Sequence, residues 1–357
     1  MSTALKQAKA PLIDKLNKAV LLELSTLPPY LTALWSIHPG SNREAVAVIR
    51  SVMMEEMLHM TLAANVLSAL GGRVDLCGAA LPAYPLLLEF DSRQQGDRVV
   101  EIHLERFSAR AIDTFMQIEL PANMPGRPGH VPAPALAIPD FTIGQFYDEI
   151  ITGLRALCEK FAPAAVFNGN PRHQISEEFF WKGGGRPIVV DGLAAAVESL
   201  QVITAQGEGA DGSLYDGDRH FFGQPEEVAH YFRFKQIREQ RYYAPTDSVA
   251  GPPSGGAVHV DYRAVFPIKP DCRQADFLAH PRLAAMSARF NAAYSMMLWQ
   301  LGEGFGGNPP LFYTAIMNGM LGLTEVARAL VASPIPGDPE HRHAAPTFEW
   351  NPAALGR

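Results

Sequence analysis

Glu55-Glu56-Met57-Leu58-His59-Met60 is the stretch of sequence that decides the fold. It lies within an apolar pattern of helical period over residues 42–71, which predicts a long helix there. Glu56 and His59 are three residues apart on the apolar face, where a charged side chain is costly unless it is paired or bound to a metal ion. One Glu-x-x-His is common by chance and usually marks a surface ion pair. The stretch therefore predicts a buried helix whose polar pair needs a partner.

The same spacing returns about 170 residues later in Glu227-Val228-Ala229-His230, within a helix predicted over 225–241. Upstream, a helix predicted over 11–37 places Glu23 at a core position. Because only a short break separates that helix from the one at 42–71, we expect the two to pack antiparallel. A Glu from each of two helices, with a Glu-x-x-His from each of two others, is the ligand set of carboxylate-bridged di-iron and di-manganese bundles.

The residues predicted to bind metal are therefore Glu23, Glu56, His59, Glu227 and His230. A further helix should add one carboxylate, and Glu208 is our candidate because its flanking glycines let the backbone approach a metal closely. Its alternative role is to order the loop after the helix predicted over 191–206. The competing candidates for this position are Glu119, Glu149 and Glu198. Such carboxylates and imidazoles suit two hard cations and leave faces open for dioxygen.

The rest of the sequence predicts a mainly α fold with insertions. Further helices are predicted over 108–119, 143–161, 281–302 and 309–332, short strands over 99–104 and 259–266, and a proline-rich linker over 121–140. We expect residues 5–245 to form a dimetal four-helix bundle with inserted loops at 73–140 and 162–190. Residues 246–357 should add a linker, a helix pair and a loosely ordered tail from Ser333, packed on the bundle.

Composition excludes several classes of function. The chain of 357 residues has 30 Lys and Arg against 37 Asp and Glu, a formal net charge of −7. Without a dense basic block, this balance argues against nucleic acid or a membrane surface as a partner. No apolar run reaches a membrane span and no signal-peptide pattern opens the chain, so we expect a cytoplasmic protein. The three cysteines lie far apart and predict neither disulfides nor a zinc site.

Five stretches resemble one known family, the ferritin-like domain of the iminophenyl-pyruvate dimer synthases, related to the C-terminal part of the violacein-pathway imine-dimer synthase. They are LELSTLPPYL (22–31), EEMLHM (55–60) with ANVL (64–67), TIGQFY (142–147), QGEG (206–209) and EVAHYFRF (227–234). The resemblance spans about residues 5–240 and does not include the long additional N-terminal region of that enzyme. It implies a ferritin-like bundle whose metal ligands are the five residues named above, with Glu208 as the sixth. Gln145 stands where we expect Glu in many relatives, so that position is not expected to bind metal.

Two classes of function follow from the ligand pattern and the resemblance. The first is a non-haem oxidase or oxygenase that holds two Fe ions, or Mn, and uses dioxygen to oxidise a small substrate derived from an amino acid. The second is a non-catalytic ferritin-like protein that stores or detoxifies metal. The long insertions favour the first, because storage proteins of this kind are usually short bundles. The apolar C-terminal helix pair is also compatible with a homo-oligomer.

Overall fold

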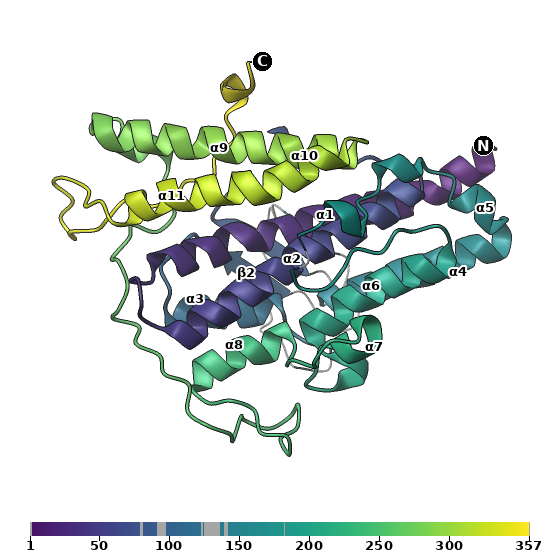
Figure 1. Cartoon of the computed structure of the whole chain (residues 1–357), viewed down its shortest axis with the longest axis horizontal. Helices are drawn as coiled ribbons and strands as arrows, with labels where there is room; N and C mark the ends of the chain where they lie inside the picture. The colour runs from purple at the N-terminus through teal and green to yellow at the C-terminus, as the bar shows by residue number, and fades with distance from the viewer. Residues whose placement is uncertain are drawn as a thin grey trace.

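Helices make up most of the structure (Figure 1), a computed structural model that describes residues 2–78, 81–90, 98–122, 124, 136–138, 142–181 and 183–356. The mainly α fold predicted from the sequence is confirmed. No helix among these residues is long and apolar enough to cross a membrane.

Four helices form a closed ring. They are α1 (Thr3–Ser36), α2 (Arg43–Ala69), α4 (Ile143–Lys160) and α6 (Leu193–Glu208). α1 packs on α2, α2 on α6, α6 on α4 and α4 on α1, so that their apolar faces share one core. The predicted four-helix bundle is confirmed, but α4 stands in it where the sequence placed the helix predicted over 225–241.

Two of the bundle helices extend beyond their predicted ranges. α1 begins at Thr3 because the hydroxyl of Ser2 accepts a hydrogen bond from the backbone of Leu5 and caps the first turn. α6 continues to Glu208, beyond the predicted end at residue 206, so this residue is the last of its helix. Gly209 follows it with a φ of 103°, a conformation that favours glycine and stops the helix.

A small sheet forms within the first inserted loop. β1 (Leu86–Phe90) pairs antiparallel with β2 (Arg98–Ile102) and parallel with β3 (Leu136–Ile138). β2 corresponds to the strand predicted over 99–104. β3 lies inside the linker predicted over 121–140, and most of that linker falls outside the described residues.

Two helices cover one end of the bundle. α3 (Ala109–Ile118) packs on α8 (His230–Glu239), and α8 also packs on α2 and α6. The helix predicted over 225–241 is wrong in its first turns, because the chain before α8 is extended there. Val228 forms an isolated antiparallel bridge with Tyr215, which holds this segment against a neighbouring loop. His230 is therefore the first residue of its helix.

Shorter helices lie in the connections between these elements. They are α5 (Pro163–Val166), α7 (Asp218–Phe222) and 3₁₀ turns at Pro171–His173, Glu177–Phe179, Ala210–Gly212, Gln274–Phe277 and Pro352–Leu355.

The C-terminal helices lie along the α1 and α2 pair, on the opposite side from α4 and α6 (Figure 1). α9 (Pro281–Phe305) is followed by α10 (Pro309–Thr314) and α11 (Met320–Val331). A π-helical turn over Ala315–Gly319 joins the last two. These elements cover the two helices predicted for this region.

Two predictions for the C-terminal region are wrong. Residues 259–266 form no regular strand, and Val265 makes only an isolated bridge with Ile37. The tail after Ser333 is ordered, because Phe348 is buried and its ring contacts Phe290 and Tyr294 of α9. The prolines of the tail predicted loose order, but apolar side chains such as Phe348 pack the tail against α9.

Candidate metal centre

Five buried polar side chains converge where α3 and α8 meet the bundle. Glu23 comes from α1, Glu56 and His59 from α2, Glu119 from the end of α3, and His230 from the start of α8. None of them is more than 5% exposed. The helical spacing of α2 places Glu56 and His59 on one face, as the sequence predicts. The other three reach the same point from separate elements.

Each of the three carboxylates has one oxygen held by a hydroxyl group. The donors and acceptors are Thr26 to Glu56 Oε2 at 2.7 Å, Tyr30 to Glu119 Oε1 at 2.5 Å, and Tyr147 to Glu23 Oε1. All three hydroxyls belong to buried side chains of α1 or α4. The carboxylates are therefore fixed in orientation by the bundle itself.

The remaining carboxylate oxygens face the two imidazole rings. Oε1 of Glu56 lies 3.4 Å from Nδ1 of His59 and 3.0 Å from Nδ1 of His230. Oε2 of Glu23 lies 3.6 Å from Nδ1 of His59, and Oε2 of Glu119 lies 3.6 Å from Nδ1 of His230. Glu56 therefore lies between two pairs of side chains. His59 and Glu23 form one pair, and His230 and Glu119 form the other.

A hydrogen-bond network fixes the tautomer of His59. Its Nε2 lies 2.9 Å from Oε1 of Gln206. The amide nitrogen of Gln206 donates to the backbone oxygen of Gly184 at 3.0 Å and to Asp218 at 2.8 Å, so its oxygen must be the acceptor. Nε2 of His59 therefore carries the proton, and Nδ1 faces the cluster with a free lone pair in the neutral ring.

His230 is held in the same way by a charged partner. Its Nε2 lies 2.8 Å from Oε2 of Glu55. Arg233 donates to the other oxygen of Glu55 at 2.7 Å and to Asp216 at 3.0 Å. Burial favours the neutral form of Glu55, but Arg233 and His230 outweigh it and lower its pKa to about 2. Glu55 is therefore an ionised acceptor that orients the ring.

The cluster has the properties of a cation site. Nδ1 of His230 is buried and makes no hydrogen bond with any described residue. Burial disfavours protonation of His59, yet Glu23 and Glu56 raise its pKa to about 10, so the carboxylates strongly attract positive charge. Oxygen and imidazole donors of this kind suit iron and manganese, and the partners on Nε2 are the usual support of metal-binding histidines. The residues present fit a metal ion.

Two of the predicted ligands lie outside this cluster. The Glu227 side chain is 62% exposed and sits 3.6 Å from Arg233, because its residue lies in the extended segment before α8. Glu208 accepts hydrogen bonds from the backbone of Gly144 at 2.6 Å and of Ala122 at 2.9 Å. It thus binds the first turn of α4 and Ala122, which belong to other parts of the chain and not to the loop after α6 that the alternative role named.

The structure also distinguishes the three glutamates that compete with Glu208 for the remaining ligand position. Glu119 belongs to the cluster, whereas Glu198 is exposed and Glu149 is exposed and pairs with Lys15. The supporting residues Glu55 and Arg233 were not predicted. Both carry a signal in the sequence, since Glu55 adjoins Glu56 in an apolar helix and Arg233 follows His230 by three residues.

Comparison with known proteins agrees with this fold. Residues 16–239 match the family model described as ferritin-like, and the chain belongs to the ferritin-like family. Among curated proteins it is 24% identical to dichlorochromopyrrolate synthase of Lentzea aerocolonigenes over 98% of this chain and 37% of that protein. It is 26% identical to 2-imino-3-(indol-3-yl)propanoate dimerase of Chromobacterium violaceum over 85% of this chain and 30% of that protein.

The chain therefore spans about a third of the length of these relatives, and the resemblance noted from the sequence is confirmed. Among solved structures, a ferritin-like protein from Caulobacter vibrioides aligns with a TM-score of 0.57 at 20% identity. That alignment covers 95% of this chain and 97% of the other, and at this identity it shows a shared fold.

Proposed function

We propose that this chain is a dimetal oxidase or oxygenase that uses dioxygen to oxidise a small anionic substrate derived from an amino acid. The observation that carries the proposal is the arrangement of the three ligand carboxylates. Each has one oxygen fixed by a hydroxyl, while the other faces an imidazole Nδ1.

The donors divide into two sets that share one carboxylate. Glu23, Glu56 and His59 would hold one ion, and Glu56, Glu119 and His230 would hold the other. Iron is the metal we propose, with manganese as the alternative, because hard carboxylate-rich sites accept both. When bound, such a pair supplies Lewis-acid and redox chemistry toward dioxygen.

The hydroxyl donors keep the carboxylates in place without taking part as acids. Burial, with the charges of nearby glutamates, raises the pKa values of Tyr30 and Tyr147 well above the ordinary value for tyrosine. Both phenols therefore keep their protons at neutral pH and remain donors. Each phenol binds Oε1 of its glutamate and thereby leaves Oε2 of Glu119 or Glu23 free to bind a metal ion.

Charge balance supports an anionic substrate. Three ligand carboxylates do not fully neutralise two divalent cations, and the neutral form of each histidine adds no charge. Outside the two donor sets, the guanidinium of Arg233 is shared between the carboxylates of Glu55 and Asp216. A substrate carboxylate would complete the balance, and both curated relatives have names that denote a pyrrolate or a propanoate.

Anaerobic loading with ferrous iron followed by a pulse of dioxygen tests the proposal. Wild-type chain should take up about two ions and oxidise an added 2-imino or 2-amino acid in stoichiometric amounts. His230→Ala should take up about one ion and lose the oxidation, and Glu227→Gln should keep both ions and the oxidation because its side chain lies outside the cluster. Formation of a ferric mineral without substrate oxidation would instead favour metal storage.

A further inference from the structure

A large hollow lies on the far side of the α1 and α2 pair from the metal cluster. Its volume is about 790 Å³, within the range of small-molecule sites. The end of α1, the first half of α2, the π-helical turn and α11 form its walls, with Trp181 from the second inserted loop. No residue of the metal cluster lines it.

This hollow is positively charged in an acidic protein. Arg43, Arg50 and Arg328 line it, and no aspartate or glutamate does so among the described residues. Their guanidinium groups make no ion pair or hydrogen bond with any described residue, although the whole chain carries a net charge of −7. Three cationic groups around one cavity, all free of partners within the described chain, favour an anion as the occupant.

The walls between the arginines are apolar. Trp35, Met53, Phe266 and Met320 belong to this lining. Methionine side chains adapt to irregular ligands, and aromatic rings provide flat contact surfaces. The occupant should therefore combine its negative charge with an apolar body.

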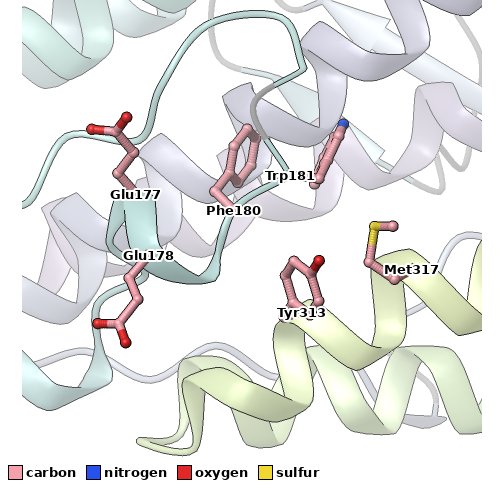
Figure 2. Close-up of a pocket in the computed structure, with 6 residues that line it drawn as sticks. All are labelled: Glu177, Glu178, Phe180, Trp181, Tyr313 and Met317. Carbon is pink, nitrogen blue, oxygen red and sulfur yellow. The ribbon is translucent and has the colours of Figure 1, made fainter.

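A second hollow adjoins the first and carries the opposite charge. Trp181 and Met317 line both. Figure 2 shows the side chains of Trp181, Tyr313 and Met317 on one side of this second hollow and the carboxylates of Glu177 and Glu178 on the other. These carboxylates disfavour an anionic group there. An amphipathic anion would thus place its charged group near the arginines and its apolar body toward Trp181.

The wall also contains the π-helical turn that joins α10 to α11. The π-helical turn contributes Ile316 and Met317 to the hollow. Such turns are rare in α-helices and occur frequently at functional sites. Here the turn interrupts the regular helix at the point where the two hollows meet.

We propose that the arginine-lined hollow binds a small amphipathic organic anion, an apolar body that carries a carboxylate, at a site separate from the metal cluster. The proposal does not rest on the metal centre or on its chemistry. It follows from the unpaired charge, the apolar walls and the oppositely charged neighbour.

Calorimetric titration of the full chain with two matched probes tests this site. 1-Naphthylacetate carries an apolar ring system and a carboxylate, and 1-naphthylacetamide has nearly the same shape without the charge. We expect the acid to bind at one site per chain and at least tenfold more tightly than the amide. In the double variant Arg50→Gln/Arg328→Gln the acid should bind as weakly as the amide, and binding of the amide should be unchanged.

Two further variants show whether binding of the acid depends on this hollow alone. Glu177→Gln/Glu178→Gln is the matched control and should bind the acid at least as tightly as wild type. His230→Ala should bind the acid normally, because that residue lies in the metal cluster. Equal affinity for acid and amide, wild-type affinity in the arginine variant, loss of binding in His230→Ala or absence of saturable binding of the acid would each overturn the proposal.

Discussion

Glu55 and Glu56 are neighbours in the chain, yet they contact opposite nitrogens of one imidazole ring. Oε2 of Glu55 lies 2.8 Å from Nε2 of His230, and Oε1 of Glu56 lies 3.0 Å from its Nδ1. Adjacent residues of a helix point about 100° apart, so the ring of His230 must insert between them. One carboxylate therefore orients the ring, while the other faces the site that the ring helps to form.

The central position of Glu56 leads to a prediction about metal stoichiometry. Glu56→Gln should lose both metal ions, because both proposed sets of ligands include this carboxylate. His59→Ala and His230→Ala should each lose about one, and Glu208→Gln should keep both. Elemental analysis of the purified variants measures this directly. Loss of metal from Glu208→Gln to the same degree as from Glu56→Gln would contradict our assignment.

The hydrogen bond between Glu55 and His230 should affect metal affinity without loss of a ligand. Residues that orient metal-binding histidines typically contribute 10–100-fold in affinity. We therefore expect Glu55→Gln to weaken one of two binding steps by about that factor in a metal titration. The step that depends on His59 should be unaffected, since Gln206 supports that ring. Two equally weakened steps would show that the sites are not separate.

The raised pKa of Glu208 leads to a prediction about how the stability of the fold depends on pH. Burial raises its pKa to about 7, compared with about 4.3 in an unfolded chain. The folded state therefore binds this proton more tightly, and the free energy of unfolding should fall as pH rises from about 4 to about 7. The loss over this range is of order 1–3 kcal/mol.

Glu208→Gln should flatten this part of the stability profile. Thermal or urea unfolding of both proteins from pH 4.5 to 7.5 gives the two slopes. Glu23 also has a raised pKa, so only the difference between variant and wild type reports on Glu208. Parallel profiles would mean that the carboxyl group titrates normally in the folded chain.

Gly184 should be intolerant of a side chain. Its φ is +71°, and an added Cβ would lie 2.7 Å from Cγ of Glu55 and 3.0 Å from its Cα. Its carbonyl also accepts the hydrogen bond from Gln206, so this residue touches the supports of both histidines. Gly184→Ala should cost of order 2 kcal/mol and lower metal affinity.

A glycine in open space provides the control for that substitution. Gly302 lies inside α9, and an added Cβ there would meet nothing within 4 Å. Gly302→Ala should be neutral or stabilise the chain by up to about 1 kcal/mol. Melting temperatures of the two variants should therefore move in different directions. A similar decrease in the melting temperatures of both variants would contradict the conclusion that Gly184 is specifically intolerant of a side chain.

Periodicity predicted the long helices and the half of the cluster that α1 and α2 supply. Glu23, Glu56 and His59 lie on continuous apolar stripes, so a local pattern is sufficient to find them. Glu119 and His230 reach the cluster from helix ends, where tertiary contacts decide the position of a side chain. His230 was found through the Glu-x-x-His spacing, although the structure does not place that motif on one helix.

Glu227 illustrates why the motif alone misleads. Its backbone N–H lies 3.2 Å from the carboxylate of Asp216, and its carbonyl accepts from the backbone of Asp216. These contacts hold the residue in an extended segment and turn its side chain toward solvent. The partner Asp216 lies eleven residues away, so the sequence around Glu227 does not show that the helix begins only at His230.

The distribution of the cluster along the chain has a consequence for its biosynthesis. Glu23, Glu56 and His59 all lie within the first 59 residues, whereas His230 follows about 170 residues later. At a ribosomal rate of roughly 5–20 residues per second, roughly 10–30 s separate the emergence of His59 from that of His230. The nascent α1 and α2 hairpin thus carries three of the five cluster side chains before the rest of the centre exists. On the proposed assignment, metal that meets the growing chain would encounter an incomplete and open half-site, which the later arrival of Glu119 and α8 completes.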